Sequence, residues 1–227
     1  EESLLKGIRS LEIGVYHLYM SKFDGVATKD LLDYIKHGTD DRIYAIAELL
    51  RRNVSLEEIG EKTQIDNFFL RKLRNVIDEE REIKNNPLDI ETLFDAKKTG
   101  FSDKEIAKLW KTTETEVFNL RKRENIFPVY KMIDTCSSEF KSYVPYFYST
   151  YEEENESIVS NKKKILVLGN GHIRIGQGVE FDYSTVHAVK TIKAAGYEAI
   201  IINNNPETVS TDYTTSDKLY FEPLTPE

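Results

Sequence analysis

The feature of this chain that most constrains its fold is an unbroken apolar run that leads directly into a glycine-rich loop. The run is Ile165 to Leu168, and its continuous hydrophobicity predicts a strand covered on both faces in a parallel sheet. The glycines of the loop are Gly169, Gly171, Gly176 and Gly178. Glycine lets the backbone approach a ligand or another chain segment closely, because no Cβ intervenes.

The residues after this loop predict a helix and two further strands. Apolar positions recur with helical spacing from Val186 to Ala195, and Gly196 stands where a helix C-cap is expected. A second apolar run, Ala199 to Ile202, leads into the polar segment 203–217, and a third short run is Leu219 to Phe221. We therefore expect a β-loop-α-β unit, and such units bind ligands at the carboxyl ends of their strands.

A dinucleotide site is disfavoured by the spacing of the glycines. Gly169 and Gly171 are separated by one residue, but the next glycine, Gly176, comes too late for the G-x-G-x-x-G pattern. The second predicted strand ends in the asparagines of 203–205, with no acid to hold a ribose. These residues argue against nicotinamide or flavin binding.

The two loops nevertheless place many polar side chains at one edge of the predicted sheet. They are Arg174, Gln177, Glu180, Asp182, Asn203, Asn205, Glu207, Thr208 and Asp212. Such residues can line a ligand site, or they can pair with one another to close two tight turns. The sequence leaves both interpretations open.

Residues 1–150 predict charged helices with an internal repeat of about 47 residues. The segments 55–58 (SLEE) and 102–105 (SDKE) match as capping boxes, in which serine and glutamate satisfy helix-end amides reciprocally. Asn53 and Gly100 occupy matching C-cap positions, which need a left-handed residue. Each copy is about three helices with one apolar stripe, typical of a shared core.

A helix-turn-helix DNA-binding motif is the alternative interpretation of this region, since 102–125 have its rhythm. A recognition helix presents its first residues to the bases, and here these would include Glu114 and Glu116. The chain carries 31 basic and 39 acidic residues, and it has no basic footprint for nucleic acid. A stand-alone helical interaction or DNA-binding protein with an appended nucleotide-type βαβ domain stays the alternative function.

The composition favours a reducing compartment and argues against a membrane or metal protein. Cys136 is the only cysteine, so an intramolecular disulfide is impossible. There is no signal peptide and no apolar run long enough to span a membrane. The four histidines are scattered without the spacing of metal ligands.

Two long polar motifs resemble one family closely. IRIGQGVEFDYSTVHA (173–188) and NPETVSTDYTTSDKLYFEP (205–223) are similar to the opening of the second half of the carbamoyl-phosphate synthetase large subunit. The helical region resembles the connecting domain between the two halves of that subunit. Its landmarks are RSLEIG (9–14), DRIYAIAELLR (41–51), VYKMIDTC with SSEF (129–140) and PYFYSTYEEE (145–154). The sequence departs from the family at Asn170 and His172, where the family usually has Ser or Gly and then Pro.

The resemblance implies an α plus α/β architecture. We expect a helical oligomerisation and connection domain over 1–150, a solvated linker over 151–162, and a truncated Rossmann-like pre-ATP-grasp βαβ domain with a parallel sheet over 163–227. Residues 127–151 should run extended across a surface, because they are aromatic-rich and contain two prolines. On this interpretation the chain is an excised piece of a longer subunit, with the ATP-grasp module beyond Glu227.

The function implied by the resemblance is that of an ATP-dependent carbon-nitrogen ligase. The parent would make carbamoyl phosphate from bicarbonate, glutamine-derived ammonia and two ATP with Mg²⁺ or Mn²⁺, in the cytoplasm, for arginine and pyrimidine synthesis. Its partners would be a glutaminase small subunit and other large subunits, with no nucleic acid and no membrane. The chain by itself is expected to be inactive and to bind no cofactor tightly.

The candidate site residues follow from the same resemblance. We expect Arg174, Gln177, Gly178, Glu207, Thr208 and Asp212 to form part of the wall where carbamate enters the second active site, with Gly169, Gly171 and Gly176 shaping the loop. Gly178 would keep the bore open, and Arg174 and Glu207 would set its polarity and cross-link the loops. Thr208 and Asp212 would hold the second loop in place. No catalytic residue and no metal ligand is expected in this chain.

Overall fold

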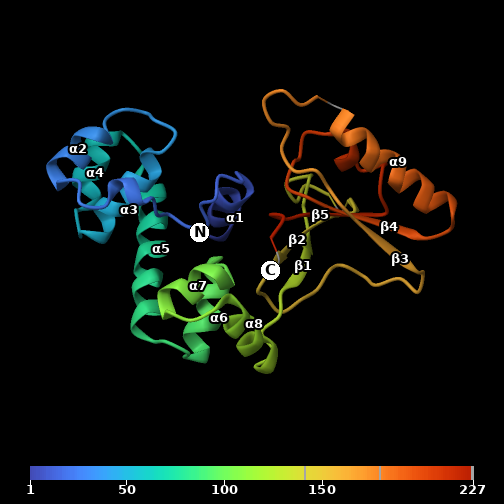
Figure 1. Ribbon diagram of the computed structural model, residues 1–227, viewed down its shortest axis with the longest axis horizontal. Coiled ribbons are helices and arrows are strands. Elements are labelled where there is room, and N and C mark those ends of the chain that lie inside the picture. The colour runs from blue at the N-terminus through green and yellow to red at the C-terminus, as the bar shows by residue number, and fades with distance from the viewer. Residues whose placement is uncertain (141, 179, 226–227) are drawn as a thin grey trace. The chain divides into compact units, whose positions relative to one another are not determined.

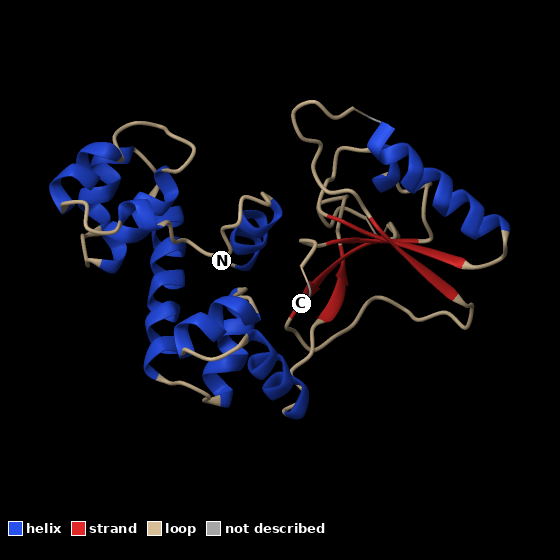
Figure 2. Cartoon of the chain, viewed as in Figure 1, coloured by secondary structure: helices blue, strands red, loops and turns tan. Residues whose placement is uncertain are grey.

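The computed structural model describes residues 1–140, 142–178 and 180–225. The chain divides into two compact units, Glu1–Ile126 and Phe127–Glu227. The first unit is helical, and the second contains the sheet (Figure 2). This composition agrees with the predicted α plus α/β architecture.

The helical unit is organised around one long helix, α5. Its elements are α1 (Glu2–Ser10), η1 (Ser21–Phe23), α2 (Thr28–Tyr34), α3 (Arg42–Arg51), α4 (Leu56–Thr63), α5 (Asn67–Asn85), α6 (Ile90–Thr99), α7 (Asp103–Trp110) and α8 (Glu114–Arg123). Helix α5 contacts α3 and α4, which precede it in the chain, and α6 and α7, which follow it (Figure 1). Its apolar side chains Leu70, Val76 and Ile77 are fully buried, so α5 ties the two copies of the repeat together.

The helix boundaries have the same 47-residue spacing as the repeat in the sequence. Helix α7 begins 47 residues after α4, at Asp103 against Leu56, and α8 begins 47 residues after α5, at Glu114 against Asn67. The predicted left-handed positions agree as well, since φ is +61° at Asn53 and +102° at Gly100. The repeat is therefore a repeat of local geometry as well as of sequence.

The predicted capping boxes are half formed. Ser55 Oγ accepts from the Glu58 N–H at 3.1 Å, and Ser102 Oγ accepts from the Glu105 N–H at 3.2 Å. The described contacts do not include the return bond from either glutamate to the serine backbone. Glu105 instead lies 3.5 Å from Lys108 Nζ. One serine bond still satisfies an orphan amide, so each helix starts where the sequence predicts.

A complete capping box lies at the start of α8, where the sequence analysis did not place one. Thr113 Oγ1 accepts from the Glu116 N–H at 3.2 Å, and Glu116 Oε2 accepts from the Thr113 N–H at 3.0 Å. This pair gives Glu116 a local structural role. In the helix-turn-helix interpretation, Glu116 would be one of two glutamates directed toward DNA.

The second unit is a mostly parallel sheet with strand order β1-β2-β5-β4-β3. Its elements are β1 (Val129–Met132), β2 (Tyr146–Thr150), β3 (Lys164–Leu168), α9 (Glu180–Ala194), β4 (Glu198–Asn203), η2 (Val209–Thr211) and β5 (Lys218–Phe221). Strands β2, β5, β4 and β3 run parallel, and β1 pairs antiparallel with β2. The predicted β-loop-α-β unit is therefore present, as β3, α9 and β4.

The core of the sheet lies on the face that α9 covers (Figure 1). Val189 of α9 packs with Ala199 and Ile201 of β4 and with Leu219 of β5, and all four are buried. This apolar layer fixes α9 against β3 and β4. It thereby fixes the two loops that flank the helix.

The segment 127–150 was expected to run extended across a surface. Two parts of it instead form strands of the sheet. Thr150 of β2 pairs with Val129 of β1, and Phe147 of β2 pairs with Tyr220 of β5. Phe147 is 1% exposed, so its ring belongs to the interior of this unit. The compact units accordingly divide after Ile126, whereas the sequence analysis set the domain boundary at residue 150.

The segment 151–162 contains no helix or strand, yet part of it packs on the sheet. Ser157 is 5% exposed, and its hydroxyl lies 2.6 Å from the Tyr220 hydroxyl. Lys218 Nζ donates to the same Ser157 oxygen at 3.2 Å. The expectation of a fully solvated linker is wrong at this residue, because Ser157 satisfies buried polar groups of β5.

Strand β3 lies where the sequence predicts a strand, but it is less covered than predicted. It is the last strand in the order of the described sheet, with β4 as its neighbour. Leu166 is 52% exposed and Leu168 is 67% exposed, on the face opposite α9. The apolar run had predicted cover on both faces, but within this unit only one face is covered.

None of the helices in the described part of the chain is long and apolar enough to cross a membrane. The described side chains also form no cluster of three or more His, Cys, Asp or Glu that could hold a metal ion.

Candidate functional site

Two loops leave the carboxyl ends of neighbouring parallel strands. Residues 169–178, here called the first loop, follow β3, and residues 204–212, here called the second loop, follow β4. Because β3 and β4 are paired in parallel through Leu168 and Ile202, the loops start side by side (Figure 1). This is the edge of an α/β sheet at which ligands bind.

Asn203, the last residue of β4, joins the two loops at their base. Its side chain is 1% exposed, and Oδ1 accepts from the Gly171 N–H at 3.2 Å and from the Asn205 N–H at 3.2 Å. One amide oxygen thus holds the start of both loops. Asn203 is one of the three asparagines whose presence disfavoured a ribose site. The structure shows that it organises the two loops.

The glycines of the first loop serve different purposes. A Cβ on Gly169 would lie 2.5 Å from Asn203 Cγ, so this glycine makes room for the asparagine side chain rather than for a ligand. Gly176 has φ +88° and nothing near its absent Cβ, so it is required by backbone conformation. A Cβ on Gly178 would overlap the carboxylate of Glu180.

Asp182 joins α9 to the second loop. It lies in the first turn of α9, is 5% exposed, and accepts from the Ser210 N–H through Oδ2 at 2.6 Å. A carboxylate in the first turn of a helix also interacts favourably with the helix dipole. Its other oxygen, Oδ1, has no hydrogen-bond partner among the described residues.

Arg174, Gln177 and Gly178 lie in the second part of the first loop. The Arg174 N–H donates to Gln177 Oε1 at 3.0 Å, and the Gln177 N–H donates to the Arg174 carbonyl at 2.9 Å. These two bonds close a turn on itself. The Arg174 side chain is exposed, and Gly178 is half-buried.

Glu207, Thr208 and Asp212 lie along the second loop. The Glu207 N–H is capped by Asn205 Oδ1 at 2.9 Å, and the Glu207 side chain is exposed. The Thr208 carbonyl accepts from Thr211 Oγ1 at 2.8 Å. Asp212 caps the Thr214 N–H at 3.0 Å, and that bond holds the pKa of its carboxyl below the ordinary value.

Comparison with protein families identifies the origin of both units. The model of the carbamoyl-phosphate synthetase large chain, oligomerisation domain, matches residues 1–125. The model of the carbamoyl phosphate synthase preATP-grasp domain matches residues 161–227. The chain belongs to the carbamoyl-phosphate synthetase large-chain family. It is thus related to ATP-dependent ligases, and the DNA-binding alternative finds no support.

The two matches give the units of this synthetase chain different roles. The helical unit corresponds to a domain through which large chains of the family assemble. The sheet and its two loops correspond to the preATP-grasp domain. The candidate site therefore lies in the second unit, at the carboxyl ends of β3 and β4.

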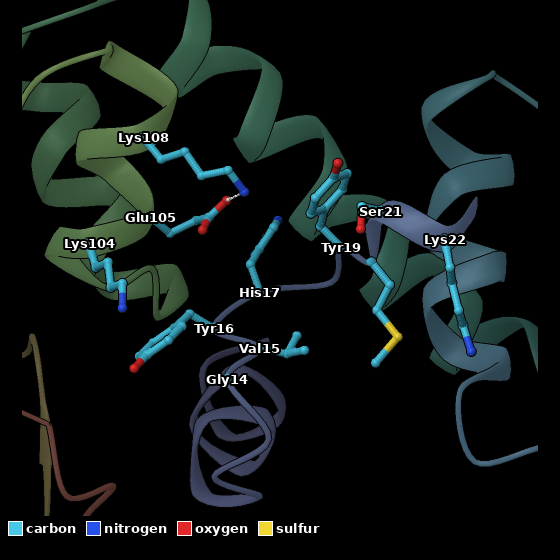
Figure 3. A pocket seen from close by; sticks show the side chains of 11 residues that line it. Gly14, Val15, Tyr16, His17, Tyr19, Ser21, Lys22, Lys104, Glu105 and Lys108 are labelled. Atoms are coloured by element: carbon cyan, nitrogen blue, oxygen red, sulfur yellow. Dashed lines mark hydrogen bonds and ion pairs between the residues drawn. The ribbon is translucent and has the colours of Figure 1, made fainter. Parts of the chain in front are cut away.

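The synthetase chain also has a concave region in its helical unit, between residues 14–22 and α7 (Figure 3). Its volume is about 550 Å³, and three lysines line it. Lys22 pairs with Asp41, and Lys108 lies 3.5 Å from Glu105. Lys104 Nζ lies 3.7 Å from the centre of the Tyr16 ring. Because carboxylates balance two of these ammonium groups, the cavity does not present the concentrated positive charge of an anion site.

His17, which lines this concave region, belongs to a buried charge network with a structural role. His17 Nε2 lies 3.0 Å from Glu80 Oε2, and Arg51 Nη2 donates to the same oxygen at 2.7 Å. Burial works to raise the pKa of Glu80, but hydrogen bonds from His17 and Arg51 hold it well below its ordinary value. This network connects residues 17–18 to α3 and α5.

Sequence reasoning noticed Asn203 and Asp182 as polar residues but did not select them as site residues. The signal available was their position, at a strand end and in a first helical turn. Their partners, the Gly171 and Ser210 amides, are backbone groups, which have no sequence signature. The structure is needed to recognise which polar residue joins which loop.

Proposed function

We propose that this chain belongs to a subunit that makes carbamoyl phosphate from bicarbonate, glutamine-derived ammonia and two ATP. Carboxyphosphate would form in the first half of the subunit and react to carbamate, which then moves to the second half for phosphorylation. Such anionic, unstable intermediates need a passage shielded from water. This chain would supply part of the wall of that passage, at the entrance to the second active site.

The observation that carries this proposal is the pair of loops joined by Asn203 in the unit that matches the preATP-grasp domain. The loops bring backbone and polar side chains together at one sheet edge. In this proposal Arg174, Gln177 and Gly178 form the part of the wall from the first loop. Glu207, Thr208 and Asp212 form the part from the second loop.

Nucleotide and metal sites are assigned to other parts of the parent subunit. The described residues form no cluster of three or more His, Cys, Asp or Glu that could hold a metal ion. The role proposed for this chain is to shape and shield the route of carbamate. ATP and its metal ion would bind in ATP-grasp modules.

The test is substitution of Gly178 by leucine in the full large subunit with its glutaminase partner. A leucine displaces the Glu180 carboxylate, which occupies the space beside Gly178, and narrows the passage. We expect the ratio of ATP consumed to carbamoyl phosphate formed to rise, because blocked carbamate decomposes. The measurement is ADP release against product, each assayed in the same reaction.

Gly38→Leu is the matched control. Gly38 lies in the helical unit with open space around its absent Cβ, and the same leucine there should leave the ratio unchanged. An unchanged ratio in Gly178→Leu, with the fold intact by circular dichroism, would remove the passage role.

The isolated chain should neither hydrolyse ATP nor form carbamoyl phosphate. The reason is that its proposed role is to form a wall, with the reacting groups on other modules. Bicarbonate-stimulated ATPase activity of the purified chain, measured by phosphate release, checks this directly. Activity that persists through a second purification step would contradict the assignment.

The helical unit has the complementary role of assembly. Its family match supports contacts between large subunits, and a glutaminase small subunit would deliver ammonia to the assembled enzyme. We place this enzyme in the cytoplasm, where carbamoyl phosphate would serve arginine and pyrimidine synthesis.

A further inference from the structure

The two loops of the proposed wall are fastened at two separate points. At their base, Asn203 Oδ1 holds the Gly171 and Asn205 amides. Farther out, α9 begins where the first loop ends, and its Asp182 holds the Ser210 amide in the second loop. Helix α9 and η2, which contains Ser210, contact each other. Asp182 therefore connects the outer parts of both loops.

The bond made by Asp182 is strong enough to fix a position. A hydrogen bond to an ionised carboxylate is about twice as strong as a neutral one, and it is not exchanged for water when the carboxylate is 5% exposed. The distance of 2.6 Å between Asp182 Oδ2 and the Ser210 nitrogen is that of a short hydrogen bond. A change in the length of this side chain must therefore move either α9 or the second loop.

Burial of Asp182 is costly for stability alone. Asp182 Oδ1 and Ser210 Oγ are both buried without a hydrogen-bond partner among the described residues. A buried polar group that is only partly satisfied costs free energy, and an apolar pair would fill the same space more favourably. A half-satisfied carboxylate at this place therefore suits the positioning of the second loop better than it suits packing.

We propose that Asp182 is a positioning residue, which sets the second loop at a fixed distance from Gly178 in the wall of the carbamate passage. The inference rests on the proposed function. Asp182 contacts no substrate in this account. It acts through the Ser210 amide on the neighbouring residues Glu207 and Thr208, which belong to the wall in the proposed function.

The experiment compares Asp182→Ala, Asp182→Asn and Asp182→Glu in the full large subunit with its glutaminase partner. Alanine removes the acceptor, and glutamate adds a methylene that shifts the Ser210 amide. Both should raise the ATP consumed per carbamoyl phosphate severalfold. Asparagine keeps an oxygen at the same place, so its ratio should stay close to that of the unmodified enzyme.

Asp217→Ala is the matched control, since Asp217 also caps a backbone amide. Its Oδ2 accepts from the Ala199 N–H at 2.8 Å, near the start of β4 and thus at the opposite end of the strands. Its loss should lower the melting temperature and leave the ratio unchanged. A merely structural Asp182 would behave in the same way.

The outcomes separate this inference from the proposed function. A raised ratio in Gly178→Leu with unchanged ratios in Asp182→Ala and Asp182→Glu overturns the positioning role alone. Unchanged ratios in all three variants overturn the passage itself. If Asp182→Ala does not fold, the comparison of Asp182→Glu with Asp182→Asn decides, because both keep a hydrogen-bond acceptor.

Discussion

Gly169 and Gly178 belong to one loop, but a methyl group would meet very different neighbours at each position. Beside Gly169 lies the buried Asn203 side chain, which cannot turn away without releasing the Gly171 and Asn205 amides. Beside Gly178 lies the carboxylate end of Glu180, an exposed and flexible side chain. The cost of substitution therefore depends on what the neighbour holds in place.

We predict that Gly169→Ala destabilises the second unit by about 1–3 kcal/mol, because overpacking displaces Asn203. Gly178→Ala should stay within about 0.5 kcal/mol of the unmodified chain, because Glu180 moves into water. Hydrogen exchange of the β3 and β4 amides measures the change within this unit.

A double-mutant cycle tests the cause of this destabilisation. Asn203→Ala removes Cγ and Nδ2, which would lie 2.5 and 2.7 Å from the new methyl group, and leaves only Cβ close to it. The pair of substitutions should therefore cost less than the sum of its parts. Strict additivity would mean that Gly169 serves another purpose.

Lys97, in the helical unit, is a buried lysine whose pKa is set by its surroundings. It is 1% exposed, donates to the Phe101 carbonyl at 2.8 Å, and lies 3.1 Å from Asp103, which also receives Arg121. Burial lowers the pKa of Lys97 to about 7, against the opposing attraction of Asp103. In the first copy of the repeat, the same position holds the buried Leu50.

We predict that the stability of the helical unit rises with pH above about pH 7. In this window the folded chain releases the Lys97 proton, whereas the unfolded chain keeps it up to the ordinary lysine pKa of 10.5. The unfolded state then binds more protons, so the free energy of unfolding increases, by at most about 1.4 kcal/mol per pH unit.

Lys97→Leu, which copies Leu50, should abolish this rise and leave the Asp103–Arg121 pair in place. Trp110 is the only tryptophan and is buried in α7, so its fluorescence during denaturant unfolding reports on the helical unit. Parallel pH profiles for the two proteins would show that Lys97 does not titrate in this range.

Among the elements, those defined by local signals were predictable from the sequence. The repeat was visible because helix caps and left-handed residues recur at fixed spacing, and Ser55, Ser102, Asn53 and Gly100 all take the expected roles. The β3-α9-β4 unit was visible because apolar runs and helical periodicity are themselves local. In each case a few adjacent residues carry the information.

Strands β1 and β2 were not predicted as members of the sheet, because their pairing is not local. Tyr146 pairs with Leu219, far along the chain, and aromatic residues interrupted by polar ones do not form an apolar run. The exposed edge position of β3 was missed for a related reason. An apolar run indicates a strand, but the order of strands depends on which neighbours it finds.

The candidate site was predictable to the level of its loops but not of its connections. The glycine-rich loop and the polar loop lie at the carboxyl ends of β3 and β4, where the sequence predicts them. Asn203 and Asp182 could not be singled out, because their partners are backbone amides brought close by folding. The functional roles of Arg174 and Glu207 stay predictions.

For the molecule as a whole, its two units match separate domains and have different interiors. The helical unit contains buried ion networks at Glu80, which links α5 to α3 and to His17, and at Asp103, which links α7 to α6 and α8. The sheet unit has an apolar core under α9 and a polar edge with the loops. The assembly role and the proposed shielding of carbamate are thus assigned to different units of the chain.

Strand β3 has a practical consequence for handling this chain. Its outer edge has no strand beside it in the described sheet, and Leu166 and Leu168 stand exposed on the face opposite α9. An unpaired apolar edge is a template on which a second chain can add its own strand, which leads to aggregation. A lysine in place of Leu168 would place a charge at this edge and oppose such stacking. In concentrated preparations, β3 is therefore the segment to protect first.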